Sequence, residues 1–359
     1  MLPSGMFRDR ALAERLVRSL HLLARRLPGT VRIMEVCGTH TMAIARYGIR
    51  AMLPENVQLL SGPGCPVCVT APGYIDAAIA LGEKHGAVIA TFGDMVRVPG
   101  TGGRSISEVS PHVCYSPTDA LELAASTDRR VVFLAIGFET TAPTVAATVL
   151  AAERRGLENF SLLVSHKTIP PAMSALLASG KTRISAFLCP GHVSTIIGSK
   201  PYETVAREFG TPCVVAGFEP IDILHAIEMI LRQLLDGRAG VEIQYRRIVR
   251  PEGNPEAVRV MYEAYCGCDA DWRGIGVIPA SGLRLRDELR RFDAEAVFGV
   301  EVGRGRPDRR CICGLIMQGM KLPPDCRLFG GECRPESPVG PCMVSSEGAC
   351  AAYYKYRPL

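Results

Sequence analysis

Short apolar runs alternate with helix-length segments along most of this chain. Seven runs, rich in Val and Ile, occur at residues 31–36, 57–61, 87–92, 131–136, 160–165, 184–189 and 212–218. Such runs are typical of strands buried on both faces, and the segments between them are long enough for crossover helices. The pattern therefore predicts an α/β fold with parallel sheets covered by helices. An amphipathic helix is predicted over residues 6–27, ended by Pro28 and Gly29.

The spacing of the runs predicts two α/β lobes followed by a different C-terminal region. We expect lobes at residues 1–127 and 128–240, because SGPGCPV at 61–67 is echoed by LCPGHV at 188–193. From 241 to 359 the alternation stops, and Arg, Pro, Gly and Cys become frequent. This last region is predicted to be a separate, cysteine-rich domain.

Polar motifs follow four of the predicted strands. They are CGTH at 37–40, GPGCPVC at 62–68, GDMVRVPG at 93–100 and GFETT at 137–141. Ligands gather at the carboxyl ends of strands in open parallel sheets, so these loops are expected to face one cleft between the lobes. Five side chains are candidates to line it: Thr39, Asp94, Arg97, Glu139 and Thr140. They could orient a ligand or dock a partner, and helix capping is the alternative for the threonines.

Composition narrows the possible classes of protein. The 359 residues are 47% apolar and 21% charged, and the net charge of +5 contains no run of five like charges. We therefore expect a globular protein without a nucleic-acid partner. Residues 131–152 have the length of a membrane span, but Glu139 and Pro143 at its centre favour a strand, a turn and a helix. The N-terminus lacks the apolar core of a signal peptide, so a cytoplasmic location is expected.

Six of the fourteen cysteines fall between residues 311 and 350. In a large chain without an export signal, this abundance favours metal binding or redox chemistry over a disulfide framework. Four thiolates on a Gly- and Pro-rich segment suit a cubane iron–sulfur cluster, and the four candidates are Cys311, Cys326, Cys333 and Cys350. A structural zinc site and unligated core cysteines are the alternatives, although zinc usually uses closer C-x₂₋₄-C pairs.

Two pairs of thiols are candidates for redox exchange. Cys313 and Cys342 lie among the predicted cluster ligands, so they could form a dithiol that exchanges electrons with the cluster, or they could simply be packing residues. Cys65 and Cys68 form a C-x-x-C motif after a strand. That spacing allows a disulfide or the binding of one metal ion.

Cys37 is predicted to stand where a strand passes into a helix. The positive end of that helix would favour the thiolate over the thiol. His40 is close enough in sequence to carry a proton or to support a metal ligand, and a hydrogen-bonded structural histidine is the alternative. His166 and His192 end later strands and could also line the cleft.

Together the motifs resemble the HypD family of hydrogenase maturation proteins. The matching segments are MEVCGTHT (34–41), GPGCPVCVT (62–70), TFGDMVRVPG (91–100), GFETTAPT (137–144), SHKTIPPAM (165–173), PGHVSTIIG (190–198), AGFEP (216–220) and PVGPCMVSSEGACAAYYKY (338–356). The resemblance implies two Rossmann-like lobes with a cluster-bearing domain. It also implies a complex with a small HypC-like chaperone, on which Fe(II) acquires two cyanides and a carbon monoxide.

The resemblance further assigns roles to individual residues. Cys37 would be the iron ligand shared with the HypC-like partner, with His40 beside it, and Cys65 and Cys68 would be a redox or iron-binding pair. The four tail candidates would hold a [4Fe–4S] cluster, and Cys313 and Cys342 would be the adjacent thiol pair. Cyanide would come from a HypE-like donor, and the iron would pass through the HypC-like partner to the hydrogenase large subunit.

Two functions remain open on these grounds. The first is an assembly scaffold for Fe(CN)₂CO that has redox activity at most. The second is an enzyme, an iron–sulfur thiol–disulfide oxidoreductase that acts on a protein disulfide. They differ at Cys37, which a pure disulfide reductase does not require. A zinc-stabilised α/β binding protein is a third possibility.

Overall fold

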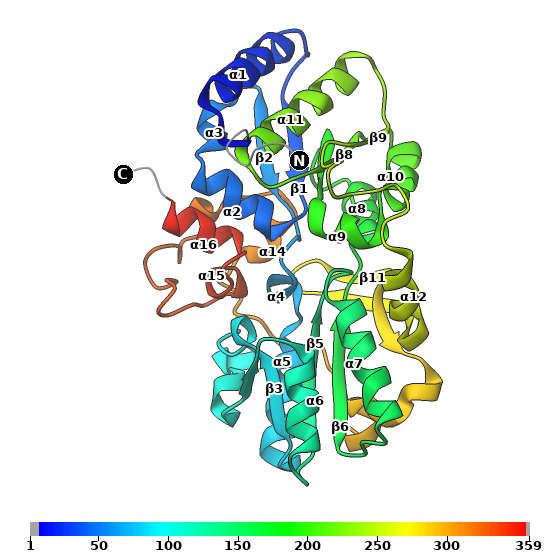
Figure 1. Cartoon of the computed structure of the whole chain (residues 1–359). Coiled ribbons are helices and arrows are strands. Elements are labelled where there is room, and N and C mark those ends of the chain that lie inside the picture. The colour runs from blue at the N-terminus through cyan, green and yellow to red at the C-terminus, as the bar shows by residue number, and fades with distance from the viewer. Residues whose placement is uncertain (1–6, 357–359) are drawn as a thin grey trace.

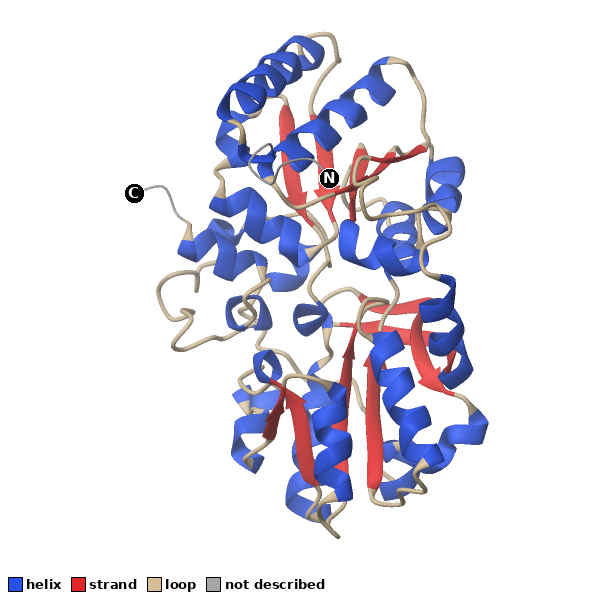
Figure 2. Ribbon diagram, in the orientation of Figure 1, coloured by secondary structure: helices blue, strands red, loops and turns tan. Residues whose placement is uncertain are grey.

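The computed structural model describes residues 7–356. Its strands form two parallel sheets and one antiparallel ribbon (Figures 1 and 2). Each of the seven apolar runs contains a strand, so the predicted α/β fold with parallel sheets is confirmed. Residues 1–6 lie outside the described residues. They include the first residue of the helix predicted at 6–27 and most of the N-terminal segment on which the prediction about export rests.

The first lobe is built on a five-stranded sheet in the order β2-β1-β7-β8-β9. Its strands are β1 (Val31–Glu35), β2 (Val57–Ser61), β7 (Ala186–Pro190), β8 (Cys213–Ala216) and β9 (Val241–Ile243). One face packs on α1 (Arg10–Ala24), α2 (Gly38–Arg46) and α11 (Pro220–Leu235), and α3 (Ile49–Met52) follows α2. The other face packs on α8 (Ile169–Ala178), α9 (Gly191–Ile197) and α10 (Pro201–Phe209).

The second lobe is built on a four-stranded sheet in the order β4-β3-β5-β6. Its strands are β3 (Val88–Phe92), β4 (His112–Cys114), β5 (Val131–Gly137) and β6 (Phe160–His166). Helix α5 (Pro72–His85) covers one face, and α6 (Pro117–Ala125) and α7 (Ala142–Arg154) cover the other. Every residue of β5 is buried because both faces are covered, which explains its continuous apolar sequence.

The sheets do not follow the predicted ranges 1–127 and 128–240. Strand β3 belongs to the first range but pairs with β5, with Val88 opposite Val131. Strand β7 belongs to the second range but pairs with β1, with Ile33 opposite Ala186. The chain therefore passes between the lobes after β2 and again after β6. The predicted ranges need this correction because an apolar run shows that a strand is buried but does not identify its neighbour.

The region from residue 241 onward is also divided between several parts of the molecule. Strand β9 completes the first sheet, whereas α12 (Pro255–Ala264), the ribbon of β10 (Tyr265–Trp272) and β11 (Gly276–Leu285), and α13 (Ala294–Phe298) pack on the second lobe. The cysteine-rich tail, residues 311–356, contains α14 (Cys313–Met317), α15 (Pro341–Val344) and α16 (Ala349–Lys355). The tail packs against α2 and the short helix α4 (Pro66–Val69), at the junction of the lobes (Figure 1).

Residues 131–152 form β5, a turn and most of α7, as predicted. Across residues 7–356, no helix combines the length and the apolar character that a bilayer crossing requires.

Candidate functional site

Cys37 follows strand β1 and is the N-cap residue of α2, as the sequence predicts. The GPGC loop after β2 lies directly against it. The backbone nitrogen of Gly38 donates to the carbonyl oxygen of Gly64 at 2.8 Å. A Cβ atom on Gly64 would overlap the backbone nitrogen of Cys37, so a glycine is required for the two loops to meet.

A cavity of about 450 Å³ opens beside Cys37. Loops from both lobes and from the tail contribute to its wall, and its polar lining residues are Cys37, Thr39, Thr140, Thr141, His192, Thr195 and Glu347. The expected cleft between strand ends is therefore present, and it contains two of the five predicted polar candidates, Thr39 and Thr140. His192, a weaker candidate, also lines it.

Cys37 is only 7% exposed. Its pKa is raised to about 12, chiefly by burial; the backbone N–H groups of His40 and Thr39 act against the rise, and the nearby carboxylate of Glu347 adds to it. The helix N-terminus thus acts in the predicted direction, but desolvation outweighs it. The expected thiolate is not favoured here, and Cys37 is a protonated thiol at neutral pH.

Glu347 is a site residue that the sequence analysis missed. The Oγ1 hydroxyl of Thr39 donates to its Oε1 at 2.7 Å. A Cβ atom on Gly38 would overlap the Glu347 side chain, so this contact also depends on the glycine of CGTH. Burial raises the pKa of Glu347. The only sequence signal was its position in SSEGAC, three residues before Cys350.

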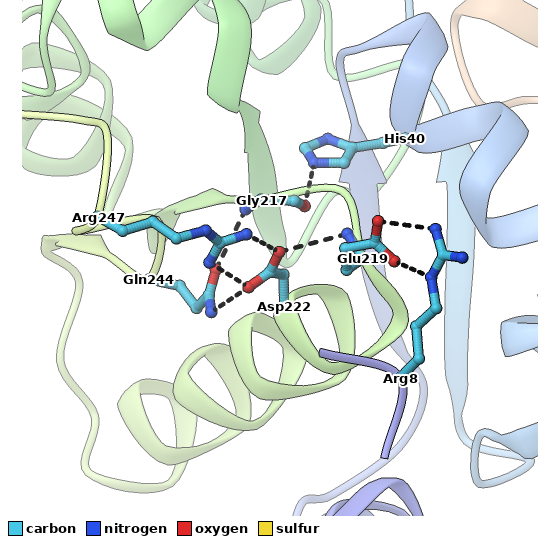
Figure 3. Close-up of polar contacts among 7 residues, drawn as sticks. All are labelled: Arg8, His40, Gly217, Glu219, Asp222, Gln244 and Arg247. Atoms are coloured by element: carbon cyan, nitrogen blue, oxygen red, sulfur yellow. Dashed lines mark hydrogen bonds and ion pairs between the residues drawn. The ribbon is translucent and has the colours of Figure 1, made fainter. Parts of the chain in front are cut away.

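His40 lies in the core beneath the cavity instead of on its wall. Its Nε2–H donates to the carbonyl oxygen of Gly217 at 2.9 Å, as Figure 3 shows, and its ring packs on Phe218 with centroids 4.8 Å apart. Burial lowers its pKa to about 4. These contacts match the structural alternative given above for this histidine.

The loop that accepts the His40 hydrogen bond is held by charged side chains. Arg247 donates to Asp222 at 2.7 Å, and Gln244 both donates to Asp222 at 3.0 Å and accepts from the backbone of Gly217 at 3.1 Å (Figure 3). Glu219 in the same loop pairs with Arg8 at 2.7 Å. This network fixes the backbone against which His40 is oriented.

Cys65 and Cys68 form a disulfide. Cys65 is the N-cap of α4, and both residues are buried, at 5% and 1% exposure. Helix α4 packs against α15 of the tail. The pair is therefore able to form a disulfide, and its position brings it next to the helix that carries Cys342. Whether the pair binds iron stays a prediction.

The tail brings its six cysteines together, although they are spread over 40 residues of sequence. The thiols of Cys311 and Cys313, and those of Cys313 and Cys342, are close enough to shift one another's pKa. Cys350 interacts electrostatically with Cys313, Cys311, Cys333 and Cys326. The tail is packed closely around them, since a Cβ atom on Gly340 would lie 2.5 Å from the Sγ of Cys311.

Within residues 7–356, no three His, Cys, Asp or Glu side chains are arranged to hold a metal ion. The tail cysteines interact with one another, but the ligand set and the cluster itself remain predictions.

Asp94 and Arg97 contact the tail and do not line the cavity. The Ser345 and Ser346 hydroxyls each donate to Asp94 Oδ2 at 3.4 Å. Arg97 donates to the carbonyl oxygen of Pro335. The loop after β3 thus docks a segment of the same chain, which the sequence analysis did not foresee.

Glu139 and Thr140 are neighbours that face different parts of the molecule. Thr140 lines the cavity beside Cys37, whereas Glu139 lines a different cavity, of about 640 Å³. Glu139 Oε1 accepts from the backbone nitrogen of Ile169 at 2.9 Å, at the start of α8, and its Oε2 lacks a hydrogen-bond partner among the described residues. Burial raises its pKa to about 7.

Comparison with known proteins identifies the family. The HypD family model, described as "Hydrogenase formation hypA family", matches residues 11–357. A hydrogenase maturation factor HypD of Cupriavidus necator is 45% identical, over 98% of this chain and 96% of that protein. The HypD of Azotobacter vinelandii is 46% identical, over 98% and 95%, and that of Escherichia coli is 44% identical, over 91% and 89%. This chain belongs to the HypD family of hydrogenase maturation factors.

Proposed function

We propose that this chain is the scaffold on which the Fe(CN)₂CO fragment of a [NiFe]-hydrogenase is assembled, in complex with a small HypC-like chaperone. One observation carries the proposal. Cys37, the Cys65–Cys68 disulfide and three tail cysteines lie on packed elements at the junction of the lobes, from the β1–α2 loop through α4 and α15 to α16 and α14. The proposed iron ligand and the proposed redox thiols thus lie in one continuous region.

Cys37 is the ligand that this chain offers to its iron cargo. A thiolate is a soft ligand that suits low-spin Fe(II). Because the Cys37 pKa is about 12, iron must displace the thiol proton when it binds. Glu347, hydrogen-bonded to Thr39 next to this thiol, is placed to accept that proton.

The cavity leaves room for the other components. A single thiolate does not complete the coordination of an iron ion, so a HypC-like partner would supply further ligands through the cavity opening. In our proposal the cavity of about 450 Å³ holds the iron ion with its diatomic ligands, and the partner reaches it from the opening. A HypE-like protein would deliver cyanide through the same opening, and the hydrogenase large subunit would receive the iron by way of the HypC-like partner.

The tail is suited to a resident [4Fe–4S] cluster. Four candidate thiol ligands, Cys311, Cys326, Cys333 and Cys350, lie in this segment, and Gly340 leaves room for the sulfur of Cys311. When bound, such a cluster supplies electrons one at a time. The need for reduced thiols and iron fits a cytoplasmic location.

The two thiol pairs complete the path in our proposal. Cys342 lies on α15, which packs on the α4 helix that carries Cys68. A thiolate from the Cys313 and Cys342 pair attacks the Cys65–Cys68 disulfide, and the second thiol resolves the mixed disulfide. Two electrons and two protons thereby reach Cys65 and Cys68, and Cys313 and Cys342 become a disulfide. A cluster held by the four tail ligands would supply the electrons, taken from an external donor, that return this pair to thiols.

The alternative is an iron–sulfur oxidoreductase that acts on a protein disulfide. It would use the same thiol pairs, but it gives no role to Cys37. The cavity built around Cys37, with Thr39 and Glu347 beside it, favours the scaffold.

Infrared spectroscopy of the anaerobically purified complex with the HypC-like partner tests the scaffold directly. Cyanide and carbon monoxide bound to iron absorb where protein does not, so wild type should show both sets of bands. Cys37→Ser should lose them, and the control Cys266→Ser, on the ribbon of the second lobe, should keep them. Wild-type protein that is colourless and iron-free, yet still matures hydrogenase, would refute the proposal.

A further inference from the structure

Arg273 is a buried cation without a matching carboxylate. It lies at the end of the β10–β11 ribbon, next to Trp272, and is only 4% exposed. Its Nε and Nη1 atoms have no hydrogen-bond partner among the described residues. Burying a charged group in this way is unfavourable unless nearby negative charge compensates it, so its surroundings require an explanation.

The turn that carries Arg273 lies between helix α4, which carries Cys68, and helix α14, which begins at Cys313. The backbone nitrogen of Arg273 donates to the carbonyl oxygen of Val69 at 2.8 Å, which joins it to helix α4. The side chain of Gln318 donates to the carbonyl oxygen of Gly274 at 2.8 Å, and a Cβ atom on Gly274 would overlap Gly314 in α14. Arg273 is therefore held between the Cys65–Cys68 helix and the helix that begins at Cys313.

The groups that act electrostatically on Arg273 are mainly sulfurs. In decreasing order of effect they are Cys313, Cys311, Cys342 and Asp76. The carboxylate of Asp76 is already engaged, because it accepts from the backbone nitrogen of Thr101 at 2.8 Å and from its hydroxyl at 2.5 Å. A guanidinium does not lose its proton in proteins. With Asp76 already engaged, the sulfur groups around the start of α14 are the remaining neighbours whose charge could offset that of Arg273 once they bind a metal centre.

We propose that Arg273 is a positioning residue that neutralises the negative charge of the tail iron–sulfur centre and thereby raises its reduction potential. This inference rests on the proposed function, since it assumes the cluster. An electron added to a thiolate-bound cluster increases its negative charge, and a buried cation nearby stabilises that reduced form more than the oxidised form. The residue acts through charge and is not itself a ligand.

The test is a redox titration of the anaerobically reconstituted full-length protein with dithionite and viologen mediators, followed by visible absorbance and electron paramagnetic resonance. In Arg273→Gln, the ratio of reduced to oxidised cluster at a fixed potential should fall about tenfold, or about 59 mV for one electron. Arg273→Lys keeps the charge and should stay close to wild type. The control Arg284→Gln removes an exposed charge from the same ribbon and should have no effect.

Each outcome decides the matter. An unchanged potential in Arg273→Gln overturns the inference while the proposed function stands. If Arg273→Gln does not retain a cluster, the lysine variant decides: a cluster with wild-type potential supports a role for charge. Loss of the cluster from both variants indicates a role for side-chain shape and overturns the inference. Wild-type protein that accepts no cluster refutes the proposed function, and this inference with it.

Discussion

Cys37 and the tail cysteines are thiol sites in electrostatically opposite surroundings. Cys37 is a single thiol on the wall of a cavity, and the charge nearest to it is the carboxylate of Glu347, which raises its pKa. In the tail, neighbouring thiols and burial raise the pKa of Cys311, Cys313 and Cys342, and the guanidinium of Arg273 offsets part of that rise.

The difference between these surroundings suits the two uses that we propose for iron. A neighbouring carboxylate favours the protonated thiol, so protons compete with iron at Cys37 and a cargo bound there is able to leave. In the tail, a neighbouring cation opposes the rise in thiol pKa, and several thiols close together can hold a cofactor jointly. In our proposal a single thiol beside a carboxylate is therefore a transfer site, and several thiols beside a cation are a resident site.

Loss of a tail ligand should have the largest effect. Cys350→Ser removes one of four proposed ligands, so we expect about four irons per chain to be lost and hydrogenase maturation to fall more than about 100-fold. Iron analysis and visible absorbance of anaerobic protein measure the first, and hydrogenase activity in complemented cells the second. The control Cys266→Ser should behave as wild type. Full colour and iron content in Cys350→Ser would remove this cysteine from the ligand set.

Loss of Cys37 should separate the two sites. In Cys37→Ser we expect the tail iron and its absorbance to remain, whereas the infrared bands of iron-bound cyanide and carbon monoxide fall at least about tenfold. The reason is that this variant removes the cargo ligand and leaves the tail untouched. Simultaneous loss of tail iron would show that the two sites are not independent and would break the comparison.

The strands and the reactive thiols could be predicted from the sequence, but the strand pairings and the residues that contact the thiols could not. All seven apolar runs became strands because burial on both faces requires continuous apolar sequence. The pairing of β1 with β7 could not be predicted. The two strands are about 150 residues apart in sequence, and nothing in the sequence of β7 identifies its partner. Cysteines reveal their chemistry by residue type. Glu347 and Arg273 act through tertiary contacts alone, so an ordinary glutamate and arginine gave no signal.

His40 shows the same limit from the other side. Its place in CGTH predicted a role at Cys37, but its partner is the carbonyl oxygen of Gly217, far away in sequence. The motif indicated that a histidine matters at this position, but it did not distinguish a chemical role from a structural one.

Removal of the Glu347 charge should sharpen the comparison at Cys37. In Glu347→Gln the side chain can still accept from Thr39, but the negative charge that raises the Cys37 pKa is gone. We expect alkylation of Cys37 by iodoacetamide at pH 8.5 to become about three- to tenfold faster, because more thiolate is present. Mass spectrometry of the Cys37 peptide measures the rate. The exposed Glu336→Gln serves as the control, and an unchanged rate in Glu347→Gln would show that the carboxylate does not act on this thiol.

The smallest effect concerns the buried carboxyl group of Glu139. Its folded pKa is about 7 against an ordinary value of 4.5, so the folded protein keeps a proton that the unfolded chain releases between these values. The stability from this group is therefore complete below pH 4.5 and is lost as pH rises through 7. Glu139→Gln is neutral at every pH, and its amide oxygen can still accept from Ile169. Relative to wild type, its free energy of unfolding should rise by about 1 to 3 kcal/mol between pH 5 and pH 8.

Urea unfolding at both pH values measures this difference, and the exposed Glu158→Gln should show none. A constant difference between Glu139→Gln and wild type would mean that Glu139 is ionised in the folded protein across this range, and that a cation outside the described contacts compensates it.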